Sequence, residues 1–70
     1  MAILSATVQS FDEKAGLGVV VTSDAEQLEF HATAIADGSR SIATGAKVTC
    51  RRVPAHGGRF EATDLVVSSA

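Results

Sequence analysis

Aromatic residues are nearly absent from this chain of 70 residues, which holds three Phe and neither Trp nor Tyr. Cys50 is its single cysteine, which excludes an intramolecular disulfide and a zinc site built from several cysteines. No apolar run approaches the roughly 18 residues of a membrane span, and the opening Met-Ala-Ile-Leu-Ser lacks the features of a secretory signal. We therefore expect a soluble, cytoplasmic protein with no membrane partner.

Support for catalysis or for a bound metal is also missing. The two histidines and Cys50 do not have the tight pair spacing of metal ligands. The sequence has no nucleophile elbow, and so small a domain offers no deep pocket of the usual ligand-binding kind. We expect neither an enzyme nor a metal or other cofactor.

Charge is divided unevenly along the chain, whose net charge is −2. Residues 1–39 carry six acids and one base, a net of −5, whereas residues 40–70 carry five bases and two acids, a net of +3. The overall balance argues against a dedicated nucleic-acid binder. A fold that gathers the basic residues on one surface would still create a local basic patch. Ordinary solvated surface charge is the alternative explanation.

Short blocks of β-branched and apolar residues alternate with turn residues, the pattern of short strands. The strands are expected over residues 3–11, 17–22, 27–31, 47–53 and 59–67. Thr33 is expected to cap a short helical turn over residues 33–35. Residues 1–70 then form one domain, a small barrel or sandwich. The inward side chains are predicted to include Val8, Val20, Leu28, Phe30, Val48 and Cys50.

Five segments in order resemble the cold-shock domain family. They are residues 6–12, 14–20, 28–35, 38–42 and 45–48. The first resembles the family's Gly-Thr-Val-Lys-Trp-Phe-Asn, the second its RNA-binding motif Lys-Gly-Phe-Gly-Phe-Ile, and the third Val-Phe-Val-His-Phe-Ser-Ala-Ile. The resemblance implies an all-β fold, a five-stranded antiparallel OB-fold barrel of the cold-shock type. We expect it to be a monomer.

The resemblance also shows what this chain lacks. In the family, single strands of nucleic acid lie across a sheet face whose exposed aromatic rings stack on the bases. Six of those positions carry no ring in this chain: Ser10, Leu17, Val19, Glu29, Ala32 and Ser39. Family-like residues remain at Phe11, His31 and Arg40, and Gly16 and Gly18 would let the backbone approach a ligand.

Losing the rings lowers the expected affinity for nucleic acid. Stacking contributes about 1–3 kcal/mol of binding free energy per base. The loss of even five stacking rings therefore removes on the order of 5 kcal/mol of binding free energy. A micromolar complex has only about 8 kcal/mol in total. Tight binding by the family's usual mode is therefore not expected.

Weak binding to single-stranded RNA or DNA is the function that the resemblance implies. In this interpretation stacking comes from Phe11, His31 and Phe60, apolar contact from Leu17 and Val19, and phosphate contacts from Lys14, Arg40 and Arg59. The alternative is a protein-interaction module on the same barrel, suggested by the aliphatic residues and by Glu29.

Several of these residues have a second interpretation that involves no ligand. Phe11 either offers an exposed ring or covers an edge of the core. Phe60 either reaches the binding face from the last strand or closes an end of the barrel. His31 is either a ligand contact or an ordinary surface histidine, and Leu17 and Val19 are either a binding patch or scattered surface aliphatics.

Overall fold

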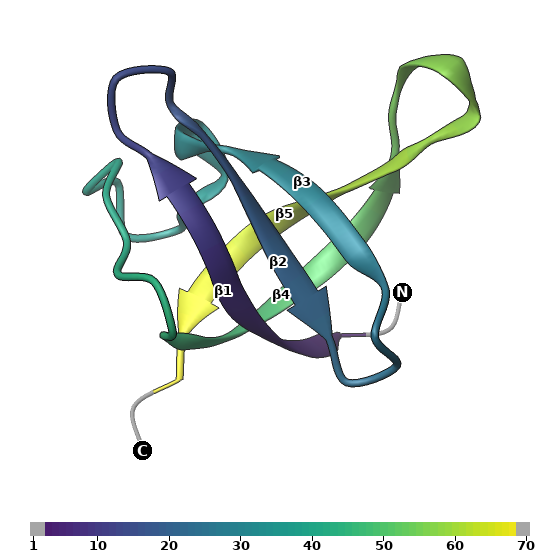
Figure 1. The fold of residues 1–70 in the computed structure, drawn as a ribbon, viewed down its shortest axis with the longest axis horizontal. Helices are drawn as coiled ribbons and strands as arrows, with labels where there is room; N and C mark the ends of the chain where they lie inside the picture. The colour runs from purple at the N-terminus through teal and green to yellow at the C-terminus, as the bar shows by residue number, and fades with distance from the viewer. Residues whose placement is uncertain (1–2, 69–70) are drawn as a thin grey trace.

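The computed structural model describes residues 3–68, which form five strands (Figure 1). The strands are β1 (Leu4–Asp12), β2 (Leu17–Thr22), β3 (Gln27–His31), β4 (Lys47–Pro54) and β5 (Phe60–Val67). Short 3₁₀ turns, η1 (Ala32–Ala34) and η2 (His56–Gly58), follow β3 and β4. All five predicted strands are confirmed, because each observed end lies within one residue of the expected one.

The strands close into a barrel in the order β1-β2-β3-β5-β4, with β1, β2 and β3 in front of β4 and β5 in Figure 1. The expectation of a purely antiparallel sheet is wrong for one pair of neighbouring strands, β3 and β5. β3 and β5 run parallel and pair at Glu29 and Glu61, whereas the other four neighbouring pairs are antiparallel. The reason is geometric, since a closed ring with an odd number of strands cannot alternate direction all the way round. The sheet is therefore mixed.

The interior of the barrel is filled by the predicted apolar side chains. Val8, Val20, Leu28, Phe30 and Val48 are each no more than 2% exposed. Cys50 is buried among them, and this burial raises the pKa of its thiol. Because successive strand residues face opposite sides of a sheet, the neighbours of these core residues are turned toward the outer surface.

Gly18 lies directly against a core side chain. A Cβ at position 18 would lie 2.5 Å from Cζ of Phe30 and 2.7 Å from the carbonyl oxygen of Ser10. The space beside Gly18 is thus occupied by the Phe30 ring. Gly16 instead forms the β1–β2 turn at φ +67°, a region that favours glycine.

The helical turn after β3 lies one residue earlier than predicted, over Ala32–Ala34. Thr33 lies inside it, so the expected Thr33 cap is wrong, and His31 at the N-cap position makes no side-chain capping bond. In the described part of the chain, neither helical turn is long and apolar enough to cross a membrane.

Candidate nucleic-acid interface

We name the outer surface of β1, β2 and β3 the outer face. It carries a row of aliphatic side chains bordered by polar ones. Leu17 on β2 pairs with Asp12 of β1 on one side and with His31 of β3 on the other. Val19 lies in the same way between Ser10 and Glu29. Leu17 is 46% exposed and Val19 is half-buried. The outer face therefore offers apolar contact with carboxylates at its borders.

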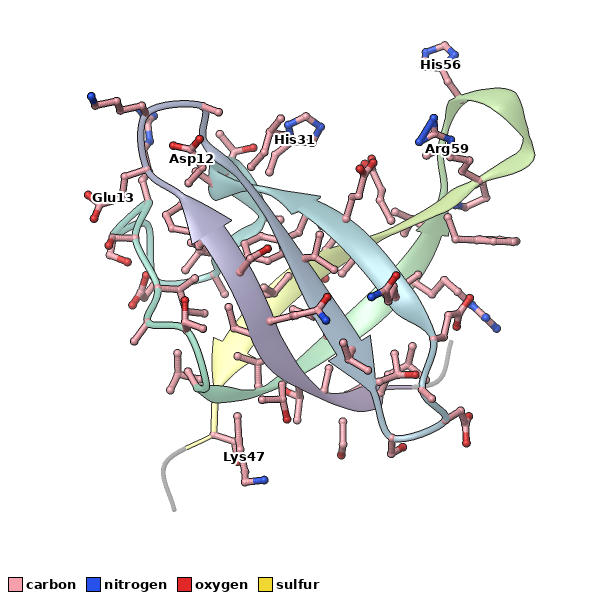
Figure 2. All side chains as sticks on the ribbon, viewed as in Figure 1. Asp12, Glu13, His31, Lys47, His56 and Arg59 are labelled. Atoms are coloured by element: carbon pink, nitrogen blue, oxygen red, sulfur yellow. The ribbon has the colours of Figure 1, made fainter. Side chains whose placement is uncertain are left out.

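A shallow hollow at one end of the outer face joins three of the predicted residues. Lys14 from the β1–β2 turn, His31 from the end of β3 and Arg40 from the β3–β4 connection line it together with Glu13. Figure 2 shows Glu13 and His31 at the same end of the barrel, opposite to Lys47. Lys14 and Arg40 are suited to hold a phosphate group in this end hollow, whereas the carboxylate of Glu13 opposes it.

Local hydrogen bonds hold the two segments that carry these cations. The Asp12 Oδ1 atom accepts from the backbone N–H of Lys14 at 3.0 Å. In the β3–β4 connection, the Asp37 Oδ1 atom accepts from the backbone N–H of Ser39 at 2.8 Å. The bonds from Ser39 lower the pKa of the Asp37 carboxyl group. Arg40 follows directly, with a φ of +59°.

A second hollow, which we name the side hollow, lies where β2, β3 and β5 meet. The predicted residues Val19, Arg59 and Phe60 line it with Glu29, and the rest of its lining comes from Glu26, Gln27 and Leu28. The volume of the side hollow is about 320 Å³. It has an apolar wall with charged groups at its margin, so it suits a flat, partly polar group.

Phe60 is on the surface and does not close the barrel end. Its side chain is 48% exposed, and the guanidinium carbon of Arg52 lies 5.1 Å from the centre of its ring. Arg52 also pairs with Glu26, with Nη1 and Oε1 2.8 Å apart. A cation over a ring is attracted by the ring's negative face, so Arg52 ties the β2–β3 turn to the start of β5.

Phe11 covers an edge of the core. Its half-buried ring stacks on Phe30, with the centroids 5.7 Å apart and the planes 4° from parallel. The interpretation that assigned Phe11 to the core edge agrees with this packing.

Three arginines of the basic second half face carboxylates. Arg51 lies 3.7 Å from Asp64, Arg52 lies 2.8 Å from Glu26, and Arg59 lies 3.7 Å from Glu29. All six side chains are at least 36% exposed. Exposed ion pairs contribute only about 0–1 kcal/mol, so a phosphate can compete at small cost for Arg51 and Arg59, whose contacts are 3.7 Å long.

His56 is a surface residue that sequence reasoning missed as a neighbour of His31. Both histidines line a third hollow with Glu61, Pro54 and Ala55, and Figure 2 shows His56 beside Arg59 on the projecting β4–β5 hairpin. No sequence signal joins residues 31 and 56, because their proximity depends on the parallel β3–β5 seam. Among residues 3–68, no group of three or more His, Cys, Asp or Glu could hold a metal ion.

Comparison of the chain with models of known protein families gave no match, and a search among curated proteins found no similar sequence.

Proposed function

We propose that this chain is a cold-shock-like OB-fold module that binds single-stranded RNA or DNA weakly. The observation that carries the proposal is the grouping of seven of the eight predicted residues. Lys14, His31 and Arg40 line the end hollow, Val19, Arg59 and Phe60 line the side hollow, and Leu17 lies on the outer face between them.

The strand arrangement supports the same proposal. OB-folds bind oligonucleotides on the face of strands 2 and 3 and on the loops that join strands 1–2 and 4–5. Leu17, Val19 and His31 belong to β2 and β3, Lys14 belongs to the β1–β2 turn, and Arg59 adjoins the start of β5. A nucleic acid strand lying across the outer face would thus meet Lys14 on one side of that face and Arg59 on the other.

Weak affinity follows from the chemistry of the outer face. Leu17 and Val19 supply apolar contact without rings, and Glu29 and Asp12 repel phosphates that pass near them. Lack of enzymatic activity, a monomeric state and a cytoplasmic location stay predictions.

Binding of a fluorescently labelled oligothymidylate of about six nucleotides, within the range of site sizes of OB-folds, tests the proposal. Anisotropy measured at low salt is expected to give a saturable curve, and the affinity should fall as salt rises because phosphate contacts release counterions. Absence of saturable binding to both the DNA and the matching RNA would overturn it.

A protein-interaction module is the second candidate. It is favoured by the pairing of exposed Leu17 with Asp12 and by Glu29 beside Val19, an arrangement that fits a basic, apolar protein segment. A protein partner that is recovered at stoichiometric amount after nuclease treatment, with no oligonucleotide binding, would support this candidate.

A further inference from the structure

The side hollow contains a carboxylate that the proposed function leaves without a role. Glu29 on β3 lines it, and its side chain is 70% exposed. A carboxylate in the middle of a surface that receives a phosphate chain lowers general affinity. It can, however, accept two hydrogen bonds side by side through its two oxygens.

Glu29 is available to a ligand in a way that its neighbour Glu26 is not. The Glu26 Oε1 atom accepts a 2.8 Å bond from Arg52, which is itself placed over Phe60. The contact between Glu29 Oε1 and Arg59 is 3.7 Å long, beyond hydrogen-bond distance, and both side chains are about 70% exposed. An exposed pair of this kind costs little to separate.

Phe60 offers a ring on the same hollow. Arg52 lies over the ring but does not line the hollow, whereas Phe60 does, and Phe60 is 48% exposed. Val19 adds an aliphatic contact from β2. A nucleobase placed here would contact Phe60 and Val19 while its edge faces Glu29, and Arg59 would be free for a neighbouring phosphate.

The bases differ in what their Watson–Crick edges present to a carboxylate, and proteins read unpaired bases on these edges. Guanine presents N1–H and the N2 amino group side by side, which matches two carboxylate oxygens. Adenine and cytosine place one amino donor beside a ring nitrogen that accepts, and thymine and uracil place one N–H between two carbonyl oxygens. The acceptors of these four bases repel the second carboxylate oxygen.

We propose that the side hollow receives one guanine base of a bound single strand, with Glu29 accepting hydrogen bonds from guanine N1–H and from its N2 amino group. The proposal rests on the proposed function and adds base selectivity to it. Arg59 holds a phosphate beside that base once Glu29 has turned to the guanine edge.

The test compares oligothymidylate with the same strand carrying a single central guanine. A good bidentate contact discriminates by at least about fivefold, and we expect a fivefold lower dissociation constant for the strand with guanine. Inosine at the same place lacks the N2 amino group, so it should lose most of the gain.

Two variants separate a specific contact from a general charge effect. In E29Q the amide cannot accept two bonds side by side, so the guanine preference should disappear while binding to oligothymidylate improves. E61Q removes the same charge at the position that pairs with Glu29 on β5, outside the side hollow, and it should keep the preference.

The outcomes distinguish this inference from the function it builds on. Equal affinity for the two strands, or a guanine preference that persists in E29Q, overturns the assignment of Glu29 and leaves weak single-strand binding intact. Failure of the unmodified protein to bind either strand at low salt overturns both.

Discussion

Gly18 and the Phe30 ring share one space inside the barrel, since a Cβ at position 18 would lie 2.5 Å from Cζ of Phe30. G18A should therefore destabilise the fold by about 1–3 kcal/mol, the usual cost of overpacking a core. Urea denaturation measures the change. The cost should shrink in an F30L background, where the smaller side chain makes room, and an equal cost in both backgrounds would contradict the close packing.

Arg52 should stabilise the barrel more than its neighbour Arg51. R52A removes the contact over Phe60 and the 2.8 Å pair with Glu26, which together are worth about 1 kcal/mol at an exposed site. R51A removes only the 3.7 Å pair with Asp64 and serves as the matched control. Equal losses of unfolding free energy in the two variants would argue against a contribution from the Phe60 contact.

The end hollow should account for part of the salt dependence of binding. K14Q combined with R40Q removes the Lys14 and Arg40 cations from the end hollow. Each phosphate contact contributes roughly 0.7 to the slope of log K against log salt. Losing two contacts should therefore make this slope shallower by about 1.4. K47Q changes a lysine at the opposite end of the barrel (Figure 2) and should leave the slope unchanged. A slope that responds equally to K47Q would place the phosphate contacts elsewhere.

Restoring a ring on the outer face should restore affinity. L17F puts an aromatic side chain at an exposed position between Asp12 and His31, and one stacking platform adds about 1–3 kcal/mol, or at least fivefold in affinity. V66F places the same ring at an exposed aliphatic position of β5, as a control. The outer face is not the binding surface if V66F improves anisotropy-measured binding as much as L17F does.

Cys50 should make stability fall in alkaline solution. Burial raises the pKa of its thiol above the ordinary value of 9.0, so the unfolded chain loses this proton at a lower pH than the folded chain does. Unfolding free energy should then decrease as pH rises above 9.0, and be unaffected by this group well below that value. C50A should remove this component of the pH dependence, as seen by denaturation at a series of pH values.

The strands and core were predictable because alternation alone specifies them. Val8, Val20 and Leu28 lie at inward positions of short strands, and each is buried as expected. The parallel β3–β5 seam was not predicted, although a closed barrel of five strands requires one. Strand direction around a ring is a global property that no local pattern expresses.

The candidate site was only partly predictable, since its grouping depends on contacts between distant segments. The pair of Arg52 and Glu26 joins residues 26 positions apart. The exposed Phe60 lies at the start of β5, next to the β4–β5 hairpin that projects from the barrel (Figure 1). The glycine pattern also does not tell that the Phe30 ring fills the space where a Cβ of residue 18 would lie.

Chemical-shift mapping by heteronuclear NMR tests the central claim most directly. Adding a short single-stranded oligonucleotide at low salt should shift the amide signals of Leu17, Val19 and His31 on the outer face. The signals of Val66 and Val67 on β5 serve as an internal reference and should stay in place. No shifts at Leu17, Val19 and His31 with millimolar oligonucleotide, or shifts confined to β5, would contradict single-strand binding on the outer face.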